Sequence, residues 1–195
     1  IKALLNNEKG LHIDKDHFMT ISPDEGSMNR AIYLANVLGV DMGMYYKRLD
    51  YSRYVNGRHP IAAYEFLGPK IEGKDMILID DMISSGDTII KIASLLKEKG
   101  AGRVYICSTF GFFTDGLDKF DDAYKKGYFD KLLTTNLVYQ SPELLEKPYY
   151  ISCDMSKYIA LIIDTLNHDT SVSHLLNPVD RIKRCVTNYM SQHEK

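Results

Sequence analysis

The sequence has few cysteines and no long apolar segment. Its three cysteines, Cys107, Cys153 and Cys185, are far apart and form no C-x-x-C pair, which argues against a disulfide framework and against a zinc cluster. The longest apolar run, 158–163, is much shorter than the roughly 20 residues that cross a bilayer. We see no charged and apolar leader of the secretory type. These absences favour a reducing compartment, so we expect a cytoplasmic protein that uses no membrane.

The sequence also lacks an excess of charge of either sign. Its 24 Lys and Arg residues against 26 Asp and Glu residues give a net charge of −2. A nucleic-acid-binding protein usually carries a basic excess, so we expect no nucleic acid partner, whereas a small anionic ligand stays compatible with the balance. A length of 195 residues, 45% of them hydrophobic, is typical of one folded domain with short appendages.

Short apolar runs alternate with helical patterns from residue 17 onward. Strands are expected at 18–21, 42–46, 76–79, 104–109, 131–134 and 149–152, and helices at 28–38, 88–99, 116–126 and after Asp154. This order predicts an α/β fold, in which helices flank both faces of a mostly parallel sheet. In the last helix, the helical spacing of Met155, Tyr158 and Ile162 predicts that these residues belong to the core.

One connection in this pattern is unusually long. Residues 47–74 contain five Gly or Pro residues and several cations, among them Arg53, Arg58 and His59. Connections of this length are usually functional or mobile, so the stretch is predicted to be a lid. Scattered cations on a solvated surface loop are the plainer interpretation.

Residues 77–88 carry the clearest chemical pattern. A buried strand is followed by two acids, a small hydroxylated loop and a helix. In open α/β sheets, ligands bind beyond the carboxyl ends of strands, where a helix N-terminus presents N–H groups to an anion. Ser84, Ser85 and Thr88 would add hydroxyls there, and the adjacent acids could accept hydrogen bonds from a sugar. The pattern predicts a sugar-phosphate site, although acids that only cap a turn would look similar.

Several blocks of the sequence resemble one known family. Residues 80–88 resemble the phosphoribosyl diphosphate signature of the type I phosphoribosyltransferase fold, and their Asp-Asp-Met-Ile opening resembles ribose-phosphate pyrophosphokinases. Residues 21–26 resemble that family's S-P-D-x-G turn, and 99–105 and 109–113 resemble its A-x-R-V-Y and T-H-G-x-F region. Residues 134–136 and 171–176 match further landmarks in the same order. The resemblance therefore extends over residues 18–176.

The resemblance implies a ribose-phosphate diphosphokinase. Such an enzyme transfers the diphosphate of MgATP to the anomeric hydroxyl of ribose 5-phosphate, which gives phosphoribosyl diphosphate and AMP. It implies ribose 5-phosphate and ATP as ligands, Mg²⁺ as cofactor and a homo-oligomer, either a dimer or a hexamer. The ribose 5-phosphate-binding residues that it implies are Asp80 and Asp81 at the ribose hydroxyls and Ser84, Ser85, Gly86, Asp87 and Thr88 at the 5-phosphate.

The resemblance also implies catalytic and metal-binding residues. Lys47 matches the lysine that opens the family's catalytic loop, and Asp24 matches an acid associated with Mg²⁺, although a turn acid after Pro23 would look the same. The family has an arginine two positions after the lysine. This chain has Leu49 there, so either Arg48 substitutes for it or the role is lost.

Two further departures from the family pattern keep other functions open. Asp87 stands where the family usually has glycine, and its carboxylate would repel a phosphate unless it turned outward to cap the helix. Phe110 stands where the family has histidine. A phosphoribosyltransferase of nucleotide salvage and a non-catalytic regulatory subunit of a synthetase are therefore the alternatives to the diphosphokinase.

The resemblance changes the expected domain organisation. Synthetases of this family pair two similar halves, and the blocks found here belong to the second. The chain also starts at Ile1 rather than at Met. We therefore expect a fragment in which 1–16 is a linker or the tail of a missing N-terminal half, 17–177 is the phosphoribosyltransferase-like domain, and 178–195 is a helical extension.

Overall fold

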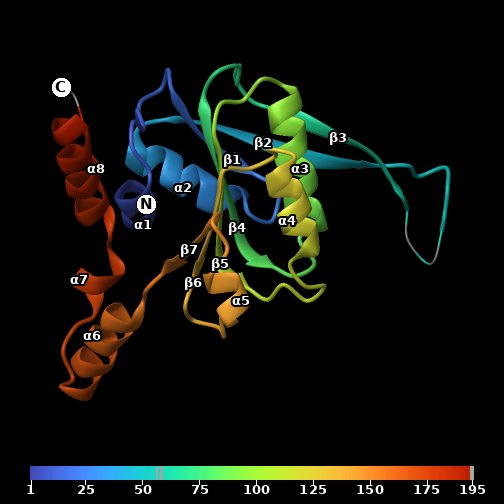
Figure 1. Cartoon of the computed structure of the whole chain (residues 1–195). Coiled ribbons are helices and arrows are strands. Elements are labelled where there is room, and N and C mark those ends of the chain that lie inside the picture. The colour runs from blue at the N-terminus through green and yellow to red at the C-terminus, as the bar shows by residue number, and fades with distance from the viewer. Residues whose placement is uncertain (56, 58, 194–195) are drawn as a thin grey trace.

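A seven-stranded sheet forms the centre of the computed structural model, which describes residues 1–55, 57 and 59–193 (Figure 1). The strand order is β3-β2-β1-β4-β5-β6-β7. All neighbouring strands run parallel except β3, which is antiparallel to β2 at one edge. The strands are β1 (Phe18–Ser22), β2 (Asp41–Leu49), β3 (Ile61–Leu67), β4 (Asp75–Ile83), β5 (Val104–Gly111), β6 (Lys131–Thr135) and β7 (Tyr150–Cys153).

Helices cover both faces of this sheet. One face carries α1 (Lys2–Asn7), α2 (Met28–Leu38) and α8 (Val179–His193), and the other carries α3 (Asp87–Glu98), α4 (Asp118–Lys125) and α5 (Pro142–Leu145). Strand β4 shows how its alternating side chains serve two cores, because Met76 and Leu78 pack on the α3 side whereas Ile77 packs on the α8 side. The predicted α/β fold with a mostly parallel sheet is confirmed. None of the helices in the described part of the chain is long and apolar enough to cross a membrane.

Local sequence signals set the ends of two helices that position the site. Helix α2 ends at Gly39, whose φ of 71° is in the left-handed region that favours glycine after a helix. Helix α3 buries Ile89, Ile92 and Leu96 on one side. This apolar stripe fixes the direction of α3 along the sheet, and with it the position of its N-terminus at the carboxyl end of β4.

The predicted lid is a β-hairpin rather than an irregular connection over most of its length. Strand β2 continues to Leu49 and pairs with β3, so that Lys47 lies opposite Tyr64. The hairpin extends away from the body of the molecule (Figure 1). Near its tip the rings of Tyr51 and Tyr54 pack on the ring of His59, at centroid distances of 5.0 and 5.2 Å. Arg58 lies outside the described residues.

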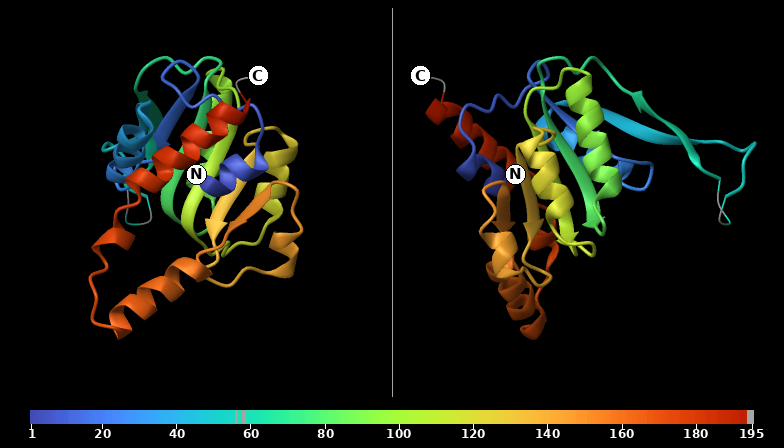
Figure 2. Two further views of the ribbon diagram at one scale, coloured as in Figure 1. Left: turned by 90° about the vertical axis from the view of Figure 1, so that its left-hand side faces the viewer. Right: turned by 45° about the vertical axis from the view of Figure 1, so that its right-hand side comes forward.

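The prediction that helix α6 (Ser156–Asn167) contributes to the core is wrong. Met155, Tyr158 and Ile162 are only half-buried, and Ile163 is 62% exposed. Helices α6 and α7 (Ser173–Leu176) extend away from the sheet in both views of Figure 2. The apolar residues of α6 do repeat at helical spacing. Such a repeat identifies an apolar stripe on the helix, but it does not show whether another part of the chain covers that stripe.

Candidate functional site

The predicted site residues lie where the parallel strands end. A pocket of about 160 Å³ at this edge is lined by side chains that follow β1, end β4 and begin α3. Its lining includes seven residues that the sequence singled out, namely Asp24, Asp80, Ser84, Ser85, Gly86, Asp87 and Thr88. The pocket is smaller than the typical 300 Å³ or more of a drug-sized ligand site. Its size suits a phosphate with part of a sugar.

Asp80 is the acid that faces this pocket. Its Oδ1 accepts a hydrogen bond from Ser27 Oγ at 2.6 Å and one from the backbone N–H of Asp81 at 2.8 Å. Burial raises the pKa of Asp80, and the negative charge of Asp24 acts in the same direction. Asp80 is therefore held in position, and a ligand that donates hydrogen bonds or carries positive charge would favour its ionised form.

Asp81 pairs with an arginine of helix α2. Its carboxylate accepts a hydrogen bond from the Arg30 guanidinium at 3.3 Å, and it does not line the pocket. The adjacent acids thus bind two residues at the start of α2, Ser27 and Arg30, and of the two only Asp80 lines the pocket.

The loop between β4 and α3 requires glycine at one position. Gly86 has a φ of 83°, and a Cβ at this residue would lie 2.2 Å from Cζ of Phe120. Next to Gly86, Ser85 Oγ accepts a hydrogen bond at 3.4 Å from the backbone N–H of Asp87, the first residue of α3. The N-terminal N–H groups of α3 and the hydroxyls of Ser84, Ser85 and Thr88 therefore meet in one small loop, an arrangement that favours an anion.

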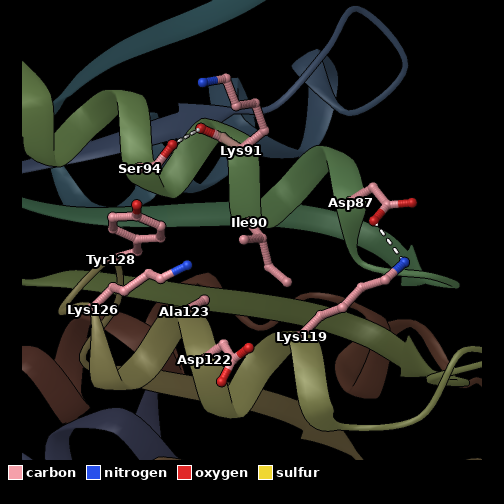
Figure 3. Close-up of a pocket in the computed structure, with 9 residues that line it drawn as sticks. All are labelled: Asp87, Ile90, Lys91, Ser94, Lys119, Asp122, Ala123, Lys126 and Tyr128. Atoms are coloured by element: carbon pink, nitrogen blue, oxygen red, sulfur yellow. Dashed lines mark hydrogen bonds and ion pairs between the residues drawn. The ribbon is translucent and has the colours of Figure 1, made fainter.

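Asp87 pairs with Lys119 of helix α4 (Figure 3). Its Oδ1 accepts a hydrogen bond from Lys119 Nζ at 2.8 Å, and its Oδ2 accepts one from Ser85 Oγ at 3.0 Å. The bonds from Lys119 and Ser85 lower the pKa of Asp87. Asp87 is thus ionised beside a cation, and Lys119 offsets its charge near the loop between β4 and α3.

Lys47 and Arg48 face opposite sides of strand β2. Lys47 Nζ lies 3.8 Å from Asp24 Oδ2, at the pocket. Arg48 Nε instead donates to Glu65 Oε1 on β3 at 2.6 Å, and Tyr46 donates to the same carboxylate. The alternation of a strand thus brings Lys47 to the site, whereas Arg48 is placed outside it.

The two acids of the pocket can hold a metal ion only when a bound ligand completes its coordination. The described residues contain no group of three or more His, Cys, Asp or Glu that could hold a metal ion. Asp24 and Asp80 nevertheless line one pocket. Mg²⁺ is commonly bound by one or two carboxylates while substrate phosphates and water complete its octahedral coordination. These two residues therefore fit a Mg²⁺ ion that arrives with a phosphate ligand.

Phe110 makes one edge of the site apolar. In the sheet it lies opposite Met82, which lines the pocket, and its ring stacks on Phe112 at a centroid distance of 6.2 Å. Phe112 is 52% exposed. This edge of the site offers the faces of two aromatic rings.

Three residues that contact the predicted site were not singled out from the sequence. They are Ser27, Arg30 and Lys119, which bond Asp80, Asp81 and Asp87 respectively. Ser27 and Arg30 directly follow the S-P-D-x-G-like turn, and their positions at the start of a helix could have suggested them. The pairing of Lys119 with Asp87 spans 32 residues and could not be read from the sequence.

Comparison with known proteins assigns the family. The sequence profile described as the phosphoribosyl synthetase-associated domain matches residues 58–177. The chain belongs to this family. A ribose-phosphate pyrophosphokinase of Vibrio parahaemolyticus is 29% identical over 163 residues, which is 83% of this chain and 49% of the relative. One of Vibrio cholerae is 29% identical over 176 residues, or 90% of this chain and 52% of the relative.

The comparisons also define how much of the relatives this chain represents. The chain is a distant homologue of ribose-phosphate pyrophosphokinases and aligns to their C-terminal half. It spans about half the length of the curated relatives that it matches. The phosphoribosylpyrophosphate synthetase of Mycobacterium smegmatis superposes with a TM-score of 0.64 at 24% identity, covering 78% of this chain and 45% of that one. The last match shows a shared fold.

Proposed function

We propose that this chain forms the ribose 5-phosphate-binding half of a ribose-phosphate diphosphokinase. The observation that carries the proposal is one small pocket lined by Asp24, Asp80 and the Ser84–Thr88 loop, with Lys47 Nζ 3.8 Å from Asp24 Oδ2. Carboxylates suit sugar hydroxyls, and a helix N-terminus suits a phosphate. Membership of the synthetase-associated family supports the same substrate.

In the proposed reaction the chain mainly positions its substrate. The loop 84–88 binds the 5-phosphate, and Asp80 accepts hydrogen bonds from the ribose. The anomeric oxygen then bonds to the β-phosphorus of ATP, while the bond from that phosphorus to the α,β-bridging oxygen breaks and AMP leaves. Lys47 is placed to offset negative charge that spreads over the transferred phosphates, which is the main electrostatic task in phosphoryl transfer.

The proposed enzyme also needs Mg²⁺ and the other half of the protein. Asp24 and Asp80 would hold the ion through a phosphate-bearing ligand, and it would supply Lewis-acid stabilisation of phosphate charge. Because the relatives are about twice as long, the remaining ATP contacts are expected from residues outside this chain. The proposal also includes a homo-oligomer, dimer or hexamer, which sedimentation velocity can measure.

Calorimetry with ribose 5-phosphate tests the binding step. The chain should bind ribose 5-phosphate more tightly than ribose or inorganic phosphate alone, and Asp80→Asn should weaken that binding at least tenfold, because it removes an acceptor for a charge-assisted bond. Asp164→Asn on α6 is the matched control, since that acid is exposed and far from the pocket in the fold. Equal binding of ribose and ribose 5-phosphate would refute the assigned phosphate loop.

A transfer assay then separates catalysis from binding. The protein is incubated with ribose 5-phosphate and MgATP, and formation of AMP and phosphoribosyl diphosphate is followed over a range of Mg²⁺ and phosphate concentrations. Release of diphosphate from phosphoribosyl diphosphate and a nucleobase would instead indicate a salvage phosphoribosyltransferase. Because the remaining ATP contacts are expected outside this chain, the assay is also run on the full-length protein, and ribose 5-phosphate binding without either reaction there would refute the diphosphokinase.

A non-catalytic subunit of a synthetase is the second candidate. Two observations favour it: Arg48 is paired with Glu65 outside the pocket, and Phe110 makes one edge of the site apolar. This candidate predicts that the protein co-purifies with an active synthetase and changes its rate. Activity of the protein by itself would exclude it.

A further inference from the structure

A second cavity lies on the α8 side of the sheet, behind the strand that carries the sugar-phosphate pocket. It has a volume of about 300 Å³ and lies between strands β4 and β5 and the helices α1, α2 and α8. Its apolar lining includes Leu34, Ile77, Ile79 and Ile182. Ile77 is 1% exposed. The floor of the cavity is therefore apolar, and its volume is at the lower end of the range for small-molecule sites.

The charged residues at this cavity are all cations. Lys2, Arg30 and Arg181 line it, and none of the described residues that line it is acidic. Both arginines are exposed, which places them toward solvent relative to the buried floor. Cations that border an apolar cavity without acids among them favour a ligand that brings negative charge to the same place.

Each arginine is held in place and still has donors to offer. Arg181 donates to the carbonyl oxygen of Leu175 at 2.6 Å and lies over the ring of Tyr158, 5.6 Å from its centroid. Arg30 donates to Asp81 at 3.3 Å. A guanidinium carries five N–H groups in a planar fork that suits carboxylate and phosphate oxygens, so each side chain can bind a further acceptor.

The cavity is distinct from the pocket assigned to ribose 5-phosphate. The two share no lining residue, and they lie on opposite faces of β4. Helix α8 supplies one wall, and this helix begins at Val179, beyond the end of the family match at residue 177.

We propose that this cavity binds a small amphipathic anion. Its hydrocarbon part would pack on Ile77, Ile79 and Ile182, because removing apolar surface from water stabilises the complex. Its head group, a carboxylate or a phosphate, would bind the guanidinium groups of Arg30 and Arg181, because charge-assisted bonds to a planar fork are strong.

Arg30 couples this cavity to the sugar-phosphate side. It contacts Asp81, the residue next to Asp80, so an anion that draws Arg30 into the cavity changes the surroundings of strand β4 where the pocket begins. Binding of the anion and of ribose 5-phosphate would then influence each other reciprocally. This coupling rests on the proposed function, whereas the binding of the anion does not.

Calorimetry on the full chain with octanoate, octyl phosphate and octanol tests the site. Octanoate or octyl phosphate should bind at least tenfold more tightly than octanol, and comparing the two anions distinguishes the head groups. Arg181→Gln should weaken binding of the anion at least tenfold. Cys185→Phe should prevent binding, because the larger side chain fills the cavity while every cation stays in place. Arg184→Gln is the matched control on α8, because Arg184 is exposed and does not line the cavity.

Methyl NMR places the ligand and keeps the test independent of stability. Octanoate should shift the methyl signals of Ile77, Ile79 and Ile182 but not that of Ile163 on α6. Equal affinity for octanol, unchanged affinity in Arg181→Gln, or shifts spread over α6 would overturn the proposal. If octanoate binds while ribose 5-phosphate does not, the proposed function fails and the anion site stands.

Discussion

Replacing Gly86 by alanine tests how the phosphate loop is built. The added Cβ would lie 2.2 Å from Cζ of Phe120, and the backbone there has a φ of 83°. The ring cannot move aside freely, because Phe120 is fully buried and makes an edge contact with Phe113 at a centroid distance of 5.2 Å. A left-handed backbone costs a residue with a Cβ roughly 1–2 kcal/mol. Overpacking a filled core adds about 1–3 kcal/mol.

The free energy of unfolding of Gly86→Ala should therefore fall by about 2–5 kcal/mol, the sum of the two costs. Urea unfolding measures it, with Gly127→Ala as the matched control. Gly127 has a φ of 70° but has no atom within 4 Å of an added Cβ, so this variant should show only the backbone cost of roughly 1–2 kcal/mol. The alanine at position 86 should also displace the loop and weaken the binding of ribose 5-phosphate.

A second substitution separates the steric part from the backbone part. In Gly86→Ala/Phe120→Leu, the smaller side chain should relieve part of the clash, so the two changes together should cost less than the sum of the two single changes. Equal losses in Gly86→Ala and Gly127→Ala, or strictly additive losses in the double variant, would refute the claim that Phe120 makes glycine necessary at this position.

Six further substitutions, two of which serve as controls, test the charges around the pocket. Lys119→Met should raise the pKa of Asp87 toward its ordinary 3.8, which NMR titration measures, and should weaken the binding of ribose 5-phosphate, which calorimetry measures. Lys125→Met should change neither quantity. Burial raises the pKa of Asp80, so the folded protein loses stability as the pH rises from 3.8 through that higher pKa. Asp80→Asn should therefore unfold at higher urea than the parent at neutral pH while binding ribose 5-phosphate poorly, and a less stable variant would contradict the burial argument. Lys47→Met should lower the transfer rate at least tenfold and Arg48→Met by less than about threefold, because Lys47 contacts an acid that lines the pocket whereas Arg48 pairs with Glu65. Asp81→Asn should weaken the binding of ribose 5-phosphate much less than Asp80→Asn does. Equal losses of affinity would show that both acids bind the sugar.

Local patterns predicted those parts of the fold that local physics determines. The strand at β4 follows from a short apolar run, which in a parallel sheet is buried on both faces. Helix α2 was placed at 28–38 from its apolar spacing and from Gly39, and the structure has the same bounds. In both cases the residues that decide the conformation lie within a few positions of one another.

Strand β3 and the exposure of α6 depend on distant partners. The sequence Ile61–Leu67 contains two alanines and alternates weakly, so it becomes a strand because β2 extends far enough to pair with it. Helix α6 has the apolar stripe of a core helix, yet Ile163 and Leu166 are 62% and 60% exposed. The helical spacing of its apolar residues does not show whether another segment covers the stripe.

The site was predictable as a set of residues but not as a geometry. The loop Ser84–Thr88 and Asp80 do share one pocket. Hydrogen bonds from Ser27 to Asp80 and from Arg30 to Asp81, across 53 and 51 residues, give the two acids separate partners, and only Asp80 lines the pocket.

That separation gives the adjacent acids different tasks. Asp80 faces the pocket, where burial makes its ionisation costly until a ligand donates to it. Asp81 faces α2 and binds Arg30, which also lines the cavity beneath α8. An exposed pair of this kind contributes only about 0–1 kcal/mol to stability, so its loss would scarcely unfold the protein. A weak contact between two ligand sites is nevertheless easily broken by an anion, and it is therefore suited to carry a signal from the cavity to the strand that ends at the sugar-phosphate pocket.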